Sequence, residues 1–239
     1  MSRINNEIKH FTNLSHIWWG AKTVAGQKRY DIKYQRFKNL VNLKKEDKIL
    51  EIGCGDGEFT YRLAKNLKNK ILGTDLTPEV IKRAKESFKS YKNIVFKVDN
   101  SEKSKVGKNS FDVVCGISIL HHMSWKKALR ESYRILKKGG GIFFTEPNYY
   151  NPFIFMALHS KKMRKRYEFS PDETALVRWE VEKYLNEIGY KNVTVTNFDF
   201  LHPSTPKESI RKMIKLSSFL EKMPIIKEIS GSLIIYAEK

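Results

Sequence analysis

A glycine-rich turn and three carboxylates at the ends of apolar runs are the residues of this chain whose types and spacing can do chemistry. The turn, in ILEIGCGDGEFT at 49–60, places Gly53, Gly55 and Gly57 directly behind an apolar run. Such a turn between a strand and a helix lets a ligand approach the backbone and points helix N–H groups at it. A dinucleotide fingerprint has the spacing G-x-G-x-x-G, and this chain has Glu58 at the third glycine, so a pyrophosphate ligand is disfavoured.

The three carboxylates indicate a different ligand. Glu51, two residues before the first glycine, suits an ammonium or sulfonium group. Asp75, at the end of the second apolar run, lies where a carboxylate can accept hydrogen bonds from ribose hydroxyls. Asp99, at the end of the third run, can accept from an adenine amino group, with the backbone N–H of Asn100 offered to the ring. Together they predict a ligand with a cationic head, a ribose and an adenine.

Five apolar runs, beginning near residues 48, 70, 93, 111 and 140, must position these groups. They alternate with helical stretches, which predicts parallel strands joined by crossover helices in a doubly wound α/β sheet. Helix starts are expected at Thr77-Pro78, at Ser124 with a stop at the glycines after Lys138, and at the capping box 170–173 with a helix to about Gly189. Two later strand-like stretches, 192–203 and 230–239, enclose a helical stretch and predict an antiparallel edge pair.

With these motifs in order, the sequence resembles the class I S-adenosylmethionine-dependent methyltransferases, specifically the broad small-molecule group. The motifs are LEIGCGDG, GTDLTPEVIKRAK, FDVVCGISILHHM and RILKKGGGIFFTEPN, and the resemblance covers about residues 45 to 148. It implies an enzyme with S-adenosyl-L-methionine as its cofactor. It also implies a Rossmann-like, doubly wound seven-stranded sheet of order 3-2-1-4-5-7-6, with the last strand antiparallel and helices on both faces.

The resemblance assigns the cofactor to the turn and the strand ends. Glu51 would face the methionine amino group, Asp75 the ribose, Leu76 the adenine face and Asp99 the adenine amino group. The expected cofactor-binding residues are Glu51, Gly53, Cys54, Gly55, Gly57, Asp75, Leu76, Asp99, Asn100 and Gly116.

His121 and Glu146 are the candidate catalytic groups. Methyl transfer from a sulfonium is an in-line displacement in which a base is optional, although a hydroxyl or carbon acid acceptor benefits from one. His121 follows the fourth strand and Glu146 ends the fifth, at the sheet edge where ligands of such folds bind. Either residue can instead be structural, as a packing histidine or as part of a turn. The candidate acceptor-binding residues are Trp18, Trp19, His122 and His202, and no metal ligand set is expected.

The 239 residues are expected to form a single methyltransferase domain. Its parts would be a helical N-terminal extension (1–42), a cofactor-binding core (43–148), and a substrate-side insert with the antiparallel strand pair (149–239). Only two cysteines occur, and neither a signal peptide nor an 18-residue apolar span is visible, so a cytoplasmic protein without a transmembrane segment is expected.

The formal net charge of +19 leaves several partners open. It fits a lysine-biased solvated surface, an anionic acceptor, or peripheral contact with a membrane through NPFIFMALHSKKMRKRY (151–167), which runs from apolar to basic. The main expectation is methyl transfer to a lipid-, sugar- or quinone-like small molecule. The alternatives are an RNA or protein methyltransferase, although no clear nucleic-acid module is visible, a non-catalytic cofactor-binding protein on the same fold, and an NAD-dependent dehydrogenase.

Overall fold

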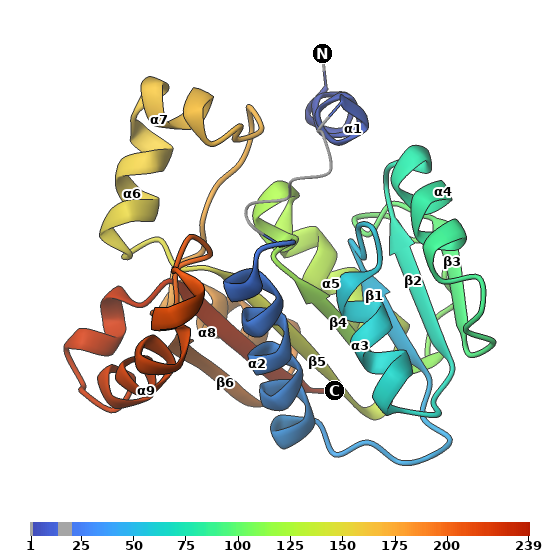
Figure 1. Cartoon of the computed structure of the whole chain (residues 1–239). Helices are drawn as coiled ribbons and strands as arrows, with labels where there is room; N and C mark the ends of the chain where they lie inside the picture. Colours follow the sequence, from blue (N-terminus) through green and yellow to red (C-terminus); the bar gives the residue numbers. More distant parts are fainter. Residues whose placement is uncertain (1, 14–20) are drawn as a thin grey trace.

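A computed structural model describes residues 2–13 and 21–239, and it contains one seven-stranded sheet (Figure 1). The strand order is β3-β2-β1-β4-β5-β7-β6, as the resemblance implied. Strands β1 to β5 are parallel, whereas β7 pairs antiparallel with both β5 and β6. The strands are β1 (Ile49–Ile52), β2 (Ile71–Asp75), β3 (Ile94–Val98), β4 (Phe111–Ile117), β5 (Leu136–Pro147), β6 (Lys191–Phe198) and β7 (Ser232–Glu238).

Helices precede the first strand and connect most of the later ones. The α-helices are α1 (Arg3–Asn13), α2 (Val24–Leu40), α3 (Glu58–Asn66), α4 (Pro78–Ser87), α5 (Trp125–Ile135), α6 (Pro152–His159), α7 (Lys161–Arg166), α8 (Arg178–Ile188) and α9 (Ile210–Leu220). Short 3-10 helices are η1 (Leu120–His122), η2 (Lys207–Ser209) and η3 (Ile226–Ile229). Within the described ranges, no helix has the length and apolar character needed to cross a bilayer.

The central strands of the sheet are buried on both faces because helices cover each face, whereas the edge strand β3 is partly exposed. Phe37 of α2 and Leu63 of α3 pack on one face, whereas Leu185 of α8 belongs to the core on the other. The neighbouring strand residues Val113 and Val114 fall into different cores, as the alternation of side chains along a strand requires. Burial from both sides explains why the parallel strands are continuous apolar runs in the sequence.

Two expected helix boundaries are wrong, and strand pairing explains both. Helix α5 ends at Ile135, ahead of the glycines, because the buried Leu136 pairs with Phe111 and already belongs to β5. Helix α8 starts at Arg178 rather than in the capping box at 170–173. There Leu176 is buried and bridges to the backbone of residues 147–149, which holds the preceding segment out of helical conformation.

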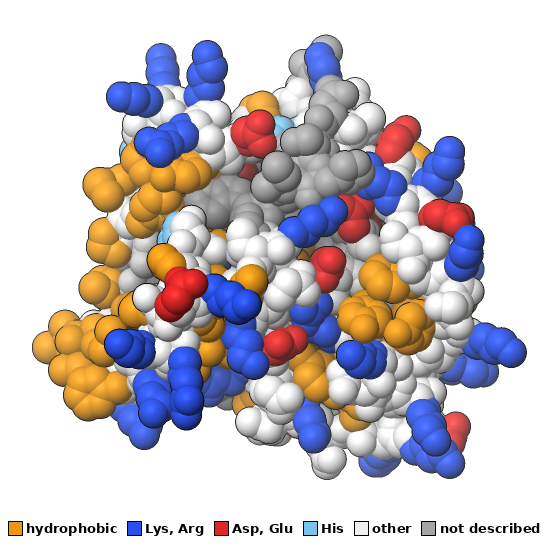
Figure 2. Space-filling view, viewed as in Figure 1, with side chains coloured by type: hydrophobic (Ala, Val, Ile, Leu, Met, Phe, Trp, Pro, Cys, Tyr) orange, Lys and Arg blue, Asp and Glu red, His pale blue; other side chains and the backbone are white. Residues whose placement is uncertain are grey.

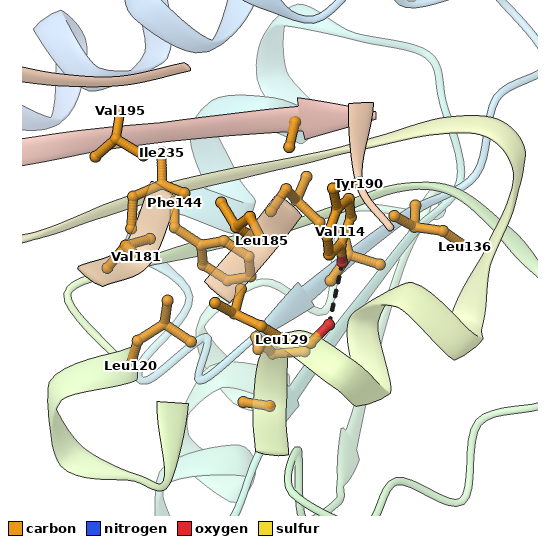
Figure 3. Close-up of a cluster of buried hydrophobic side chains, with 14 of the residues drawn as sticks. Val114, Leu120, Leu129, Leu136, Phe144, Val181, Leu185, Tyr190, Val195 and Ile235 are labelled. Carbon is orange, nitrogen blue, oxygen red and sulfur yellow. Dashed lines mark hydrogen bonds between the residues drawn. The ribbon is translucent and has the colours of Figure 1, made fainter. Parts of the chain in front are cut away.

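The larger core contains one buried polar link, between α5 and the start of β6. Figure 3 shows the Tyr190 hydroxyl among apolar side chains, donating a hydrogen bond to the Leu129 carbonyl of α5 at 3.1 Å. Tyr190 is 3% exposed, so no solvent can replace this bond. A buried carbonyl that loses its donor keeps the cost of desolvation.

We therefore expect Tyr190→Phe to lower the free energy of unfolding by about 1 kcal/mol, because it removes the hydrogen bond and leaves the ring in place. Urea unfolding measures the change. Tyr184→Phe is the matched control, since the Tyr184 hydroxyl donates to the Lys126 carbonyl of the same helix at an exposed position. Water replaces that bond, so the control should change stability by less than about 0.5 kcal/mol. Equal losses in the two variants would contradict the assignment.

Candidate functional site

The turn after β1 is built so that only glycine fits at its two most crowded points. Gly53 has a φ of +60°, and a Cβ there would lie 1.9 Å from Cγ1 of Ile119. Gly57 has a φ of +89°, and a Cβ there would lie 2.8 Å from the Phe88 ring. Left-handed backbone without a side chain brings the turn against its neighbours and leaves its other side open to a ligand.

Two buried carboxylates flank this turn. The Thr60 hydroxyl donates to Glu51 at 2.5 Å, and the backbone N–H groups of Gly55 and Thr77 donate to Asp75 at 3.1 and 2.9 Å. Burial, with a smaller contribution from the charge of Asp75, raises the pKa of Glu51 to about 8 despite the Thr60 hydrogen bond. Burial also raises the pKa of Asp75, against its backbone hydrogen bonds. A cationic ligand at this position would stabilise the ionised form of Glu51.

A first cavity opens along the carboxyl edge of the sheet at this turn. The expected cofactor residues that line it are Glu51, Gly53, Cys54, Gly55, Asp75, Leu76 and Asn100. Helices α1 and α2 close it from the N-terminal side with Arg3, Glu7, Phe11, Arg29, Tyr30 and Lys33. The cavity therefore combines the acidic strand ends with a cover that comes from the N-terminal helices.

Three expected cofactor residues are not in the lining of this cavity. Asp99 is turned toward the following loop, where its carboxylate accepts from the Ser104 hydroxyl at 2.5 Å and from the Lys105 N–H. Gly57 is the N-cap of α3 and packs against Phe88. A Cβ at Gly116 would lie 2.7 Å from Ile119, so this glycine makes room for a neighbouring side chain. Direct cofactor contact by these three residues is an expectation that the geometry does not support.

A second cavity adjoins the first, and four of the described residues line both. The shared residues are Phe11, Arg29, Ser118 and His122. The second cavity is also lined by His121, by residues of the segments 147–169 and 199–203, and by the expected acceptor residue His202. Ser118 has a φ of +54°, which is strained for a residue with a side chain, and it lies at the junction of the two cavities.

His121 is held in a fixed orientation by Glu146. The Nδ1 atom of His121 lies 2.7 Å from Glu146 Oε2, and the same carboxylate accepts from the backbone N–H groups of Ile119, Leu120 and His121. An ionised carboxylate can only accept hydrogen bonds, so the imidazole proton lies on Nδ1 and Nε2 is the unprotonated ring nitrogen. Glu146 is fully buried and lines neither cavity, so it can position His121 but cannot itself touch an acceptor.

Two further carboxylates, which no sequence motif marked as site residues, face the paired histidines. Glu173 Oε1 lies 3.8 Å from His121 Nε2, and Glu7 Oε2 lies 3.3 Å from His122 Nδ1. Burial raises the pKa of Glu173. Burial also acts to raise the pKa of Glu7, but its contacts with His122 and Ser170 outweigh burial and lower that pKa. One side-chain nitrogen of each histidine and one carboxylate oxygen of Glu173 lie within 4.8 Å of one another, close enough for His121, His122 and Glu173 to bind one divalent cation together.

Lys33 is a further residue of the site, besides Glu7 and Glu173, that the sequence did not reveal. It is 6% exposed and lines the first cavity, and burial with the nearby charge of Arg29 lowers its pKa to about 7. No motif marked it, because its burial depends on how α2 packs on the sheet. The expected residues Trp18 and Trp19 lie outside the described residues.

Comparison with known proteins finds a methyltransferase domain in part of the chain. A family model described as "Methyltransferase domain" matches residues 49–140. Phosphoethanolamine N-methyltransferase 3 of Arabidopsis thaliana is 32% identical over 114 residues, which are 47% of this chain and 23% of that protein. Demethylmenaquinone methyltransferase of Chlorobaculum parvum is 32% identical over 47% of this chain and 46% of its own. The chain thus spans less than half the length of these two relatives.

Longer but weaker likenesses extend over most of the chain. Demethylmenaquinone methyltransferase of Staphylococcus aureus is 22% identical over 82% of this chain and 90% of its own. A solved Thermotoga maritima protein, described as an S-adenosylmethionine-dependent methyltransferase and possible histamine N-methyltransferase, superposes with a TM-score of 0.67 at 19% identity and covers both chains completely. Haemonchus contortus phosphoethanolamine N-methyltransferase 2 has a TM-score of 0.67 at 18% identity, over 97% of this chain and 60% of its own. These structures share the fold.

The raised pKa of Glu51 predicts that the chain releases a proton when it binds S-adenosylhomocysteine. Glu51 is mostly protonated at pH 7 because its pKa is about 8, and an ammonium group beside it would favour the carboxylate and lower that pKa. Release should therefore approach about one proton per site at pH 7, and affinity should rise with pH and level off above about pH 8. Calorimetric titration in buffers of different ionisation enthalpy measures the release.

Glu51→Gln should abolish this buffer dependence and weaken binding. Glu58→Gln is the matched control, since Glu58 lines the same cavity but is paired with Arg62 at 3.1 Å, and it should leave proton release unchanged. Binding heats that are the same in every buffer for the wild type would show that Glu51 does not meet the cationic group.

Proposed function

We propose that this class I S-adenosylmethionine-dependent methyltransferase transfers the methyl group of a cofactor in the first cavity to a small-molecule acceptor in the second. The observation that carries the proposal is the junction of the two cavities, which share Phe11, Arg29, Ser118 and His122. A donor and an acceptor held on either side of such a junction can meet in line, and that positioning supplies much of the acceleration of a displacement reaction.

The residues of the first cavity suit the parts of S-adenosylmethionine, which supplies the methyl group as a sulfonium. Glu51 would pair with the methionine ammonium group, and Asp75 would accept hydrogen bonds from the ribose hydroxyls. Leu76 and Asn100 line the cavity where the adenine would lie. Asn100 replaces Asp99 in this assignment because the Asp99 carboxylate is occupied by its own loop.

His121 would act as the general base toward the acceptor. Its Nε2 takes the proton of an acceptor hydroxyl or carbon acid while the acceptor forms its bond to the methyl carbon and the bond from that carbon to sulfur breaks. Glu146 fixes the tautomer through the 2.7 Å contact with Nδ1 and stabilises the imidazolium that forms. Glu146 is thus a positioning residue rather than the base expected from its place at the end of β5.

The lining of the second cavity favours an aromatic, quinone-like acceptor among the small molecules considered. Among the described residues, four phenylalanines line it: Phe11, Phe153, Phe169 and Phe200. Ring contacts and apolar burial favour a flat apolar acceptor, and Arg29 and His202 can bind its oxygen atoms. The demethylmenaquinone methyltransferases of Chlorobaculum parvum and Staphylococcus aureus, to which the chain is similar, support the same class. We propose that the reaction takes place in the cytoplasm.

Transfer of a deuterated methyl group tests the function directly. The chain is incubated with methyl-deuterated S-adenosylmethionine and either hydroxylated naphthoquinols, phenols, amines, transfer RNA or a protein extract, and products are identified by mass spectrometry. Labelled quinol or phenol is the expected result. Label in RNA or protein alone would favour the macromolecular alternative. Cofactor binding without any labelled product would favour a non-catalytic protein.

His121→Ala is expected to lower kcat by about 10²- to 10⁴-fold on the acceptor so identified, because it removes the base. Affinity for S-adenosylhomocysteine should stay within about threefold, since His121 lines only the second cavity. His202→Gln is the matched control, as it changes an exposed histidine of the same cavity and should raise KM more than it lowers kcat. An unchanged kcat in His121→Ala would leave the residue with a packing role only.

A further inference from the structure

An exposed apolar face lies beside the second cavity and is formed by side chains that do not line that cavity. It is formed by Phe155, Met156, Trp179, Phe219, Ile225 and Ile229, which we call the apolar face. Ile225 is 86% exposed and Phe219 60% exposed, values that are unusual for large apolar side chains on a monomer surface. Such a face needs a partner.

The parts of this face are joined to one another. The Asn151 side chain at the start of α6 donates to the Ile229 carbonyl of η3 at 2.8 Å. The Trp179 ring at the start of α8 packs at a tilt of 33° against the Tyr150 ring, with centroids 4.9 Å apart, and the adjoining Arg178 lies 3.6 Å from Glu228. Helix α6, η3 and the start of α8 therefore form one surface, and in Figure 2 hydrophobic side chains gather along the left edge over α6 and α9.

Cations frame the apolar face at both ends. The segment 150–167 contains five Lys and Arg and no carboxylate, and Lys161, Lys162, Lys165 and Arg166 are exposed on α7. The segment 209–229 contains five more cations, whereas its two carboxylates, Glu221 and Glu228, are paired with Arg36 and Arg178. Figure 2 shows Lys and Arg side chains above and below the hydrophobic edge. The partner must therefore be apolar inside and anionic at its surface.

We propose that the apolar face docks on a membrane whose surface carries anionic lipid headgroups. Apolar side chains would enter the acyl boundary while the flanking Lys and Arg side chains meet the headgroups. A second copy of this chain fits less well, because a two-fold interface would bring the same cation clusters of two +19 chains together. The proposal goes beyond methyl transfer and does not depend on it.

Docking by this face would also place the second cavity at the membrane. Helix α6 turns Phe155 and Met156 outward, whereas Phe153 and Ile154 of the same helix line the cavity. One helix thus separates the exposed apolar face from the site proposed for the acceptor. A lipophilic acceptor could pass from the bilayer to the cavity along α6 without crossing the aqueous phase.

Vesicle sedimentation with the full chain tests the inference. Vesicles of phosphatidylcholine alone are compared with vesicles that contain about 30% phosphatidylglycerol, at low and at physiological salt. We expect binding to the anionic vesicles only, and weaker binding as salt is added. Phe219→Ser with Ile225→Ser should weaken that binding at least about tenfold, and so should alanine at Lys161, Lys162, Lys165 and Arg166 together.

Val95→Ser is the matched control, since Val95 is 51% exposed but lies on the edge strand β3. It should bind vesicles as the wild type does, and all variants should keep their affinity for S-adenosylhomocysteine. No binding to anionic vesicles would overturn the proposal, and so would binding that the Phe219 and Ile225 substitutions leave unchanged. A concentration-dependent dimer that forms without vesicles and is lost in the same double variant would assign the face to a second copy. None of these readouts requires methyl transfer, so they stand apart from the test of activity.

Discussion

A fully buried carboxylate at the end of β5 sets the geometry on which both cavities depend. An ionised carboxylate without donors costs several kcal/mol inside a protein, so Glu146 must be surrounded by N–H groups. The turn after β4 supplies them, with the N–H groups of Ile119, Leu120 and His121 and the imidazole of His121 all at one carboxylate. The same turn packs Ile119 against Gly53 and places His121 in the second cavity. It also places Ser118 and His122 at the junction of the two cavities. A single buried charge thereby fixes the relation between two adjacent strand ends and the groups that they present.

The central strands could be predicted from the sequence because burial on both faces makes them continuous apolar runs. The runs at 48, 70, 93 and 111 correspond to strands that begin at Ile49, Ile71, Ile94 and Phe111. Prediction failed where pairing overrides local signals. The residues at 170–173 form half of a capping box, since the Ser170 N–H donates to Glu173. The helix nevertheless begins only at Arg178, because Leu176 forms a β-bridge with Asn148. A local pattern cannot report a contact made with another segment.

The same difference between local patterns and contacts with distant segments decides which site residues could be predicted from the sequence. The ends of β1 and β2 could be predicted, and with them Glu51, Asp75 and the glycines 53 and 55 of the first cavity, because each of these residues lies in a short local motif. Glu7, Lys33 and Glu173 could not, since each reaches the cavities from an element packed across the sheet edge. Helix α1 illustrates the difficulty: Arg3 pairs with Glu102, and Asn6 donates to Asp172 at 3.0 Å. These partners are separated by about a hundred residues or more in the chain.

The charges around the first cavity give a physical reason for a cationic ligand in a strongly basic protein. Among the described lining residues, three of the six carboxylates pair with arginines: Asp56 with Arg83 at 2.8 Å, Glu58 with Arg62, and Glu102 with Arg3. A fourth, Glu7, lies 3.3 Å from His122. Across residues 2–13 and 21–239, Glu51 and Asp75 make no ion pair, and their hydrogen bonds come from the Thr60 and Thr77 side chains and from backbone N–H groups. The raised pKa of Glu51 follows from this lack, because burial without a counter-ion favours the neutral acid. A ligand that carries an ammonium group would supply the missing charge, so the scarcity of ion pairs at these two residues selects the ligand in a chain where cations are otherwise abundant.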